Sequence, residues 1–165
     1  KVRVNLLGSG TILREAIGAA ELLEAEFGVP ADVFSVTSFS ELRREALDAE
    51  RWNMLHPGQA PRTPYVKELL AGQSGPFVAA TDYMRTVPDQ IRQWVPGRYQ
   101  VLGTDGYGRS DSRAALRGFF EVDRRYIALA ALKSLADDGM LDMATVVSAM
   151  QRFGLDPDKP NPVTV

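Results

Sequence analysis

Cysteine is absent from this chain of 165 residues, and histidine occurs only once, at His56. Without thiolates, neither a disulfide framework nor a cysteine-ligated metal site can form, which is typical of a reducing cytoplasm. One imidazole is also too few for a typical zinc or transition-metal centre. No apolar run approaches the roughly 20 residues that a membrane-spanning helix needs. We therefore expect no metal ligands in this chain, no membrane partner and a cytoplasmic location.

An excess of positive charge is also missing, because the formal net charge is −2 at pH 7. A nucleic-acid partner is therefore not expected. The composition, with 45% hydrophobic and 24% charged residues, is typical of a globular domain. We expect a single domain over residues 1–165, with an irregular tail at about 155–165, where proline and aspartate are frequent. Because apolar Val2 follows Lys1 with no lead-in sequence, we expect this domain to be part of a larger multidomain polypeptide.

Short apolar runs alternate with amphipathic runs along the chain, which favours an α/β fold with right-handed crossovers. The run Pro76–Ala80 is almost continuously apolar, as in strands that are covered on both faces. We expect three layers, in which a mainly parallel sheet of about four to five strands has helices on both faces. The predicted strands are Val2–Leu7, Asp32–Thr37, Pro76–Ala80 and Tyr99–Gly103.

Helix boundaries are predicted from capping residues and from glycines. Thr11, Ser40 and Asp123 each precede a helical run and are predicted N-caps. Gly28 and Gly139 are predicted to end helices. The predicted helices are Ile12–Glu26, Glu41 to about Met54, Tyr65–Ala71, a segment around Pro88–Val95, Ser112–Phe120, Asp123–Asp138 and Asp142–Phe153.

The turn Gly8–Thr11 connects the first strand to the first helix, which is where a dinucleotide-binding loop would lie. The third glycine of that fingerprint is missing, since position 13 is leucine. Two readings remain open: a tight strand-to-helix turn, or a binding site for the phosphate of a nucleotide or other small ligand.

The segment Gly103–Arg113 is the strongest candidate site, because it follows a predicted buried strand at the end where α/β proteins bind ligands and partners. Its arginines could clamp a carboxylate or phosphate, or they could pair with the aspartates of the same segment and hold the loop. A ligand-facing loop and a clasp between domains therefore both remain open. The candidate residues are Asp105, Tyr107, Arg109, Ser110, Asp111 and Arg113.

A second candidate surface lies along the helix that begins at Glu41. Its mixed charges are typical of a solvated face. Trp52, Met54 and Leu55 beside them favour a partner-binding surface instead, because large apolar groups next to arginine are common in interface hot spots. His56 follows directly and is either a functional contact or a packed loop residue. An exposed apolar patch is also expected, with Trp52, Trp94, Tyr107 or the Phe119–Phe120 pair as its candidate members.

The whole chain resembles the C-terminal domain of the homodimeric-type pyruvate dehydrogenase decarboxylating component, of the transketolase-like thiamine diphosphate enzymes. One departure is Gly118, where a larger and usually basic residue is expected. The segments that carry the resemblance are NLLGSGTILREA, DVFSVTSFSELRREALDAERWNMLHP, ATDYMRTVPDQIRQWVP, LGTDGYGRSDSRAALRGFFEVDRRYIALAALKSLADDG and GLDPDKPNPVTV.

This resemblance implies that the parent enzyme decarboxylates pyruvate with thiamine diphosphate and Mg²⁺. The acetyl group would then pass to the lipoyl group of a dihydrolipoyl acyltransferase. The cofactor would lie between two other domains, and this domain would assemble the homodimer and wall the region near the active site. The resemblance therefore implies no catalytic or cofactor-binding residue in this chain, and no activity of the chain alone. The alternative is an autonomous ligand-binding domain that uses Gly8–Thr11.

Overall fold

Four parallel strands form the central sheet of the computed structural model, which describes residues 2–165. Their order is β2-β1-β3-β4, so the chain crosses over the sheet between successive strands. The predicted number and direction of strands are confirmed, as is the α/β fold class. The strands are β1 (Val4–Gly8), β2 (Ala31–Ser35), β3 (Phe77–Ala80) and β4 (Tyr99–Leu102).

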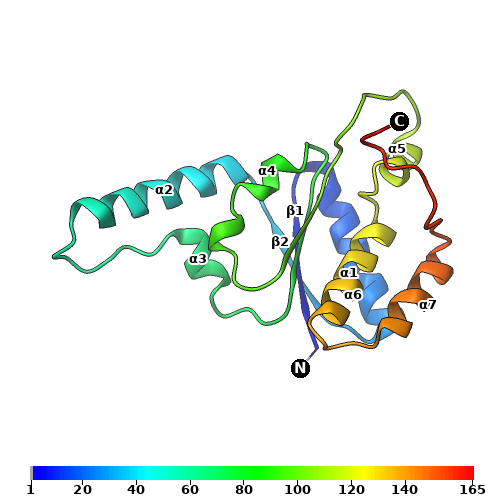
Figure 1. Cartoon of the computed structure of the whole chain (residues 1–165), viewed down its shortest axis with the longest axis horizontal. Helices are drawn as coiled ribbons and strands as arrows, with labels where there is room; N and C mark the ends of the chain where they lie inside the picture. The colour runs from blue at the N-terminus through cyan, green and yellow to red at the C-terminus, as the bar shows by residue number, and fades with distance from the viewer. Residues whose placement is uncertain (1) are drawn as a thin grey trace.

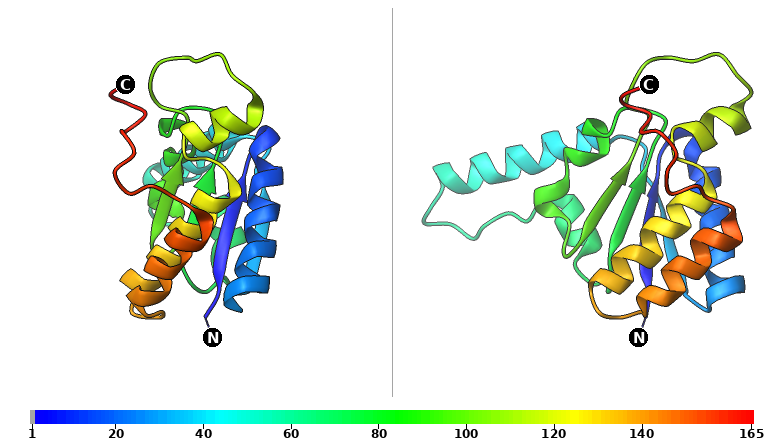
Figure 2. Two further views of the ribbon diagram at one scale, coloured as in Figure 1. Left: turned by 90° about the vertical axis from the view of Figure 1, so that its right-hand side faces the viewer. Right: turned by 45° about the vertical axis from the view of Figure 1, so that its right-hand side comes forward.

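Helices occupy both faces of this sheet, as the sequence predicts (Figure 1). On one face lie α1, α6 and α7, and on the other lie α2, α3 and α4, with α5 above the carboxyl ends of the strands (Figure 2). Helical segments are η1 (Gly10–Ile12), α1 (Leu13–Phe27), α2 (Phe39–Leu55), α3 (Tyr65–Leu70), α4 (Thr86–Asp89), η2 (Arg92–Trp94), α5 (Arg113–Phe119), α6 (Arg124–Asp137) and α7 (Met143–Phe153).

Alternate residues of the strands serve two separate cores, because successive side chains of a strand point to opposite faces. Leu6 of β1 and Val78 of β3 are fully buried against α1, α6 and α7. Leu7 and Phe77, their neighbours in sequence, are buried in the second core with residues of α2, α3 and η2. The near-continuous apolar strands therefore arise from burial on both faces, as in other three-layer α/β folds.

Two predicted helix caps are wrong. The hydroxyl of Ser38, not Ser40, accepts a hydrogen bond from the backbone N–H of Glu41 at 3.1 Å and caps α2. Thr11 caps nothing, because a turn of 3₁₀ helix precedes α1 and the Thr11 hydroxyl donates instead to Asp82. The predicted cap at Asp123 is confirmed, since its carboxylate accepts two backbone N–H bonds from the first turn of α6.

The helix predicted around Pro88–Val95 is also wrong, because two short helical segments, α4 and η2, replace it. Pro88 lies within α4 and cannot donate a backbone hydrogen bond, which limits the continuation of a helix through it. The segment ends at Trp94, whose side chain is only 6% exposed. Trp94 therefore belongs to the core beside α2 and not to an exposed apolar patch.

The segment after α7 returns to the carboxyl end of the sheet, where the C-terminus lies near the loop that precedes α5 (Figure 2). Lys159 anchors it by donating to the carbonyl of Phe119 at 2.7 Å and pairing with Glu121 at 3.0 Å. Pro162 is buried there, close to Gly106. A Cβ at Gly118 would meet its neighbours at no less than 3.5 Å, so packing does not explain the glycine at this position.

Candidate functional site

The loops at the carboxyl ends of β1, β3 and β4 are joined by side-chain hydrogen bonds. Ser9 donates to the hydroxyl of Thr81 at 2.8 Å, and Thr11 donates to the carboxylate of Asp82 at 3.3 Å. Thr104 donates to the backbone carbonyl of Asp82 at 2.7 Å. These bonds connect the three loops, so this edge of the sheet is a continuous surface of the kind on which α/β proteins carry their sites.

Residues 103–113, here called the 103–113 loop, approach the neighbouring loop closely at their first residue. A Cβ at Gly103 would lie 2.7 Å from the carbonyl oxygen of Tyr83 and 2.8 Å from the amide nitrogen of Arg85. Both contacts are to backbone, so only glycine fits. Asp105 then accepts a hydrogen bond from the Arg85 amide at 3.0 Å and lies 3.6 Å from the Arg85 guanidinium.

Of the two alternatives left open for the arginines of this loop, pairing with its own aspartates is not observed among the described residues. Asp105 pairs with Arg85 of the β3–β4 connection, and Asp111 accepts from the backbone amide of Ser112 at 2.6 Å. Arg109 instead lies 4.1 Å above the ring of Phe119, a cation–π contact. The loop is therefore anchored at its start by Arg85 and near its end by the Phe119 ring.

A cavity of about 480 Å³ lies between this loop, η1 and α5. Arg109 and Arg113 line it, whereas the exposed Ser110 and Asp111 lie outside it, beside a smaller hollow. Tyr107, also at the cavity, is 79% exposed. The cavity walls combine arginine with apolar side chains and one carboxylate. Its lining residues are Thr11, Ile12, Asp82, Thr104, Gly106, Tyr107, Gly108, Arg109, Arg113, Leu116, Arg117, Phe120 and Val122.

A buried carboxylate below this cavity was not predicted from the sequence. Glu15 of α1 is 7% exposed and accepts from Arg117 at 3.1 Å, from the Arg124 amide at 3.0 Å and from the Arg124 guanidinium at 3.2 Å. Burial acts to raise the pKa of Glu15, but these hydrogen bonds and positive charges outweigh it, so the pKa lies below its ordinary value. Glu15 therefore ties α1 to α5 and α6 and fixes the helix that follows the loop.

The second candidate surface, at Trp52 and His56, lies far from the first, at the outer end of α2 (Figure 1). The two rings are stacked with centres 4.3 Å apart, and His56 Nδ1 lies 2.8 Å from the Trp52 carbonyl. Neither residue contacts the 103–113 loop, so the structure separates the predicted site residues into two groups. Phe119 and Phe120 are half-buried and pack edge to face at 4.9 Å.

Residues 8–11 do not fit a bound phosphate. A Cβ at Gly10 would lie 3.2 Å from the carboxylate of Asp82, which also holds the Thr11 hydroxyl. An anion at this turn would therefore face a negative charge. The hydroxyls of Ser9 and Thr11 are also engaged within the chain, with Thr81 and Asp82. A Cβ at Gly8 would lie 2.8 Å from the backbone of Leu13, so close packing against α1 explains that glycine.

No group of three or more His, Asp or Glu side chains in residues 2–165 is arranged to hold a metal ion. Over the same residues, none of the helices combines the length and hydrophobicity that a bilayer crossing requires.

The class of domain follows from this fold together with one family comparison. The model of the transketolase-like TK C-terminal domain matches residues 1–123. The chain belongs to this family, which confirms the resemblance found in the sequence. A split-gene transketolase, described as an inactive beta4 tetramer, has a similar fold, with a TM-score of 0.56 at 19% identity over 81% of this chain and 39% of its own.

Within that class, the sequence is similar to pyruvate dehydrogenase E1 components of several bacteria. The identity is 59% for Pseudomonas aeruginosa over 97% of this chain, 54% for Cupriavidus necator over 99% and 52% for Escherichia coli over 98%. The chain spans 18% of the length of each of these relatives. None of these comparisons supports an autonomous nucleotide-binding domain.

Proposed function

We propose that this chain is the C-terminal domain of a pyruvate dehydrogenase E1 component. The observation that carries the proposal is the 52–59% identity to three such components over 97–99% of the chain. The parent protein is then an oxidoreductase that decarboxylates pyruvate with thiamine diphosphate and Mg²⁺. It transfers the acetyl group to the lipoyl group of a dihydrolipoyl acyltransferase, in the cytoplasm.

The role of this chain within that enzyme is assembly. We place thiamine diphosphate and Mg²⁺ on other domains of the polypeptide, with no ligand from this chain. The carboxylate of Asp82 beside residues 8–11 supports this placement, because it disfavours a bound diphosphate. The chain contacts the other two domains and the second subunit of a homodimer, and it has no activity alone.

The 103–113 loop is the part of the chain that we assign to the interface or the active-site entrance. Its backbone is anchored at Gly103 and Asp105, while Tyr107 and the polar residues that follow it stay exposed. A fixed backbone that presents exposed side chains loses little conformational entropy when another surface covers it. This combination supports a docking role for the loop.

The first experiment asks which polypeptide carries this sequence. An antibody against the domain, used on an immunoblot of source-cell extract, should detect a band several times larger than 18.1 kDa. The purified parent should release CO₂ from pyruvate only when thiamine diphosphate and Mg²⁺ are added. A band at the mass of this chain, or a parent without pyruvate turnover, would refute the proposal.

The second experiment tests the loop in the parent enzyme. Charge reversal at Arg109 together with Arg113 should weaken dimerisation or reduce pyruvate turnover, because both side chains line the cavity at this edge. The control reverses Arg43 and Lys67, which are exposed on α2 and α3 across the sheet. If dimer affinity and turnover equal those of the control, the loop is not part of the interface or the active-site entrance.

A further inference from the structure

Residues 50–63, here called the arm, bury none of their side chains. The arm comprises the outer end of α2 and the loop toward α3, and no residue between Ala49 and Pro64 is buried. Figure 1 shows this segment projecting beyond the sheet, away from the rest of the domain. Because hydrophobic stabilisation scales with the apolar surface removed from water, the arm gains little of it from its own domain.

The arm is nevertheless held in one shape by polar and aromatic contacts. Asn53 donates to the carbonyl of Arg62 at 2.9 Å and accepts from the Arg62 amide at 2.7 Å, which joins the two sides of the arm. The Arg62 guanidinium lies 4.2 Å from the centre of the Trp52 ring, and His56 stacks on the same indole. These contacts pre-organise a surface, which lowers the entropy cost of binding a partner.

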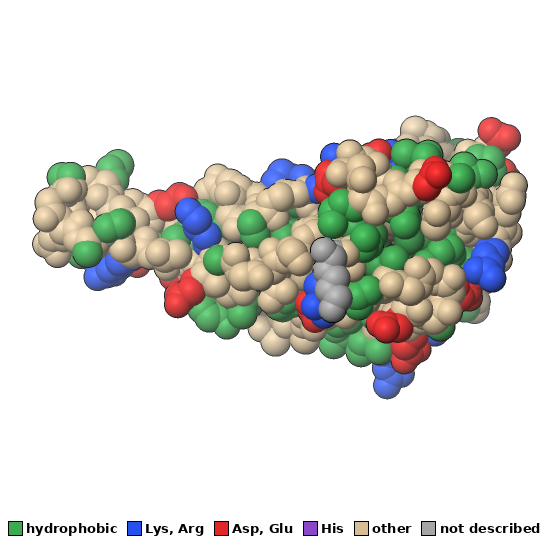
Figure 3. All heavy atoms as spheres, turned by 90° about the horizontal axis from the view of Figure 1, so that it is seen from below, with side chains coloured by type: hydrophobic (Ala, Val, Ile, Leu, Met, Phe, Trp, Pro, Cys, Tyr) green, Lys and Arg blue, Asp and Glu red, His purple; other side chains and the backbone are tan. Residues whose placement is uncertain are grey.

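The surface held in this way is apolar and nearly neutral. Met54 is 70% exposed and Leu55 is 51% exposed, and Leu47, which precedes the arm on α2, is 39% exposed. Hydrophobic side chains are visible at this end of the molecule in Figure 3. The charged residues of the arm are Glu50, Arg51 and Arg62, which give a net charge of only +1, so the arm lacks the basic cluster that nucleic acid or an anionic lipid surface would need. Tryptophan, methionine and arginine at one place favour a protein partner.

We propose that the arm docks onto a neighbouring domain of its own polypeptide, one that lies outside these 165 residues. The inference rests on the proposed function, in which the chain is one domain of a longer protein, and the chain spans only 18% of the Pseudomonas relative. A tethered domain is present at a high effective concentration, so a small contact suffices. The arm comprises only 14 residues, fewer than the roughly 20–30 residues a side of a standard interface between separate proteins.

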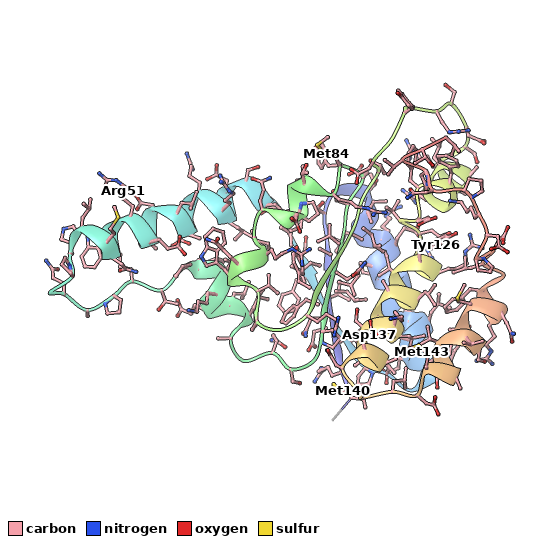
Figure 4. All side chains as sticks on the ribbon, in the orientation of Figure 1. Arg51, Met84, Tyr126, Asp137, Met140 and Met143 are labelled. Carbon is pink, nitrogen blue, oxygen red and sulfur yellow. The ribbon has the colours of Figure 1, made fainter. Side chains whose placement is uncertain are left out.

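The test uses the full-length parent protein with the photo-crosslinker p-benzoylphenylalanine in place of Met54. Met54 is exposed, so the replacement does not disturb a core. The control carries the same crosslinker in place of Met140, an exposed methionine after α6 at the lower edge of the molecule, away from the arm (Figure 4). After irradiation, position 54 should cross-link several-fold more than position 140. The product should keep the mass of one polypeptide, and its cross-linked peptide should come from outside residues 1–165.

Two results would overturn the inference. A product with twice the mass of the polypeptide would assign the arm to the second subunit, and cross-linking no stronger than at position 140 would leave it without a partner domain. Pyruvate turnover is measured on the same preparation before irradiation. If the protein turns over pyruvate but gives no intramolecular cross-link, the docking inference is refuted and the proposed function stands. If it gives the cross-link but does not turn over pyruvate, the proposed function is refuted and the docking of the arm stands.

Discussion

Replacement of Glu15 by glutamine should lower the stability of the domain markedly. The carboxylate accepts three hydrogen bonds from Arg117 and Arg124 and is nearly buried. Removing one partner of a fully buried ion pair costs about 3–5 kcal/mol. The side chains of Arg117 and Arg124 remain 22% and 46% exposed, so water recovers part of that loss. We therefore expect Glu15→Gln to cost about 2 kcal/mol, in the range of a hydrogen bond to a charged group.

Urea unfolding followed by circular dichroism measures this loss. For m near 2 kcal/mol/M, a loss of about 2 kcal/mol lowers the urea midpoint by about 1 M at unchanged m. The control is Glu24→Gln, an exposed residue on the same helix, which should stay within about 0.5 kcal/mol of wild type. Equal midpoints for the two variants would refute the view that Glu15 holds α1 to α5 and α6.

The pH dependence gives the same argument a second readout. The pKa of Glu15 in the folded protein lies below its ordinary value of 4.5, since burial, which raises it, is outweighed by the two arginines. The stabilisation is therefore complete above the pKa of the unfolded chain and is lost as the pH falls through the lower, folded pKa. The free energy of unfolding of the wild type should fall more steeply below pH 4.5 than that of Glu15→Gln.

Two further substitutions test the positions at which backbone contacts decide the local structure. Gly103→Ala should cost at least about 2 kcal/mol of stability and disorder the loop, because its Cβ would press on the backbone of Tyr83. Gly108→Ala should be neutral or slightly stabilising, because a Cβ there meets open space. The urea midpoints of the two variants measure the difference. Ser38→Ala should cost about 1 kcal/mol by removing the cap of α2, and Ser40→Ala should cost less than half as much. Equal losses in either pair would contradict the local geometry described for it.

Strands β1 and β3 could be predicted from the sequence because both of their faces are buried. The run of residues 76–80, for example, is apolar at every position. The observed strands differ from the predicted ones only at their ends: β1 was predicted to begin at Val2 and begins at Val4. Caps were harder, since Ser38 and Ser40 both precede the helix. Glu41, three residues after Ser38, has the spacing of a capping box and was the signal that could have decided between them.

The position of the candidate site was predictable, but its contacts were not. A glycine-rich loop after a buried strand must lie at the carboxyl edge of a parallel sheet. The partner of Asp105 is Arg85 on the preceding loop, and the partners of Glu15 are Arg117 and Arg124, which come from the far half of the chain. Local periodicity carries no information on such distant pairs, so these contacts could be found only in the folded structure.

Helices α6 and α7 have a consequence for the order in which the chain can fold. They complete the core around Leu6 of β1, yet both come from the last third of the sequence, beyond the matched residues 1–123. During synthesis, β1 leaves the ribosome before the two helices of this domain that complete the cover of one of its apolar faces. Within this domain α1 alone covers part of that face until nearly all of the domain has been translated, so the folding of β1 depends on late residues, and the exposed face is prone to aggregation until they arrive.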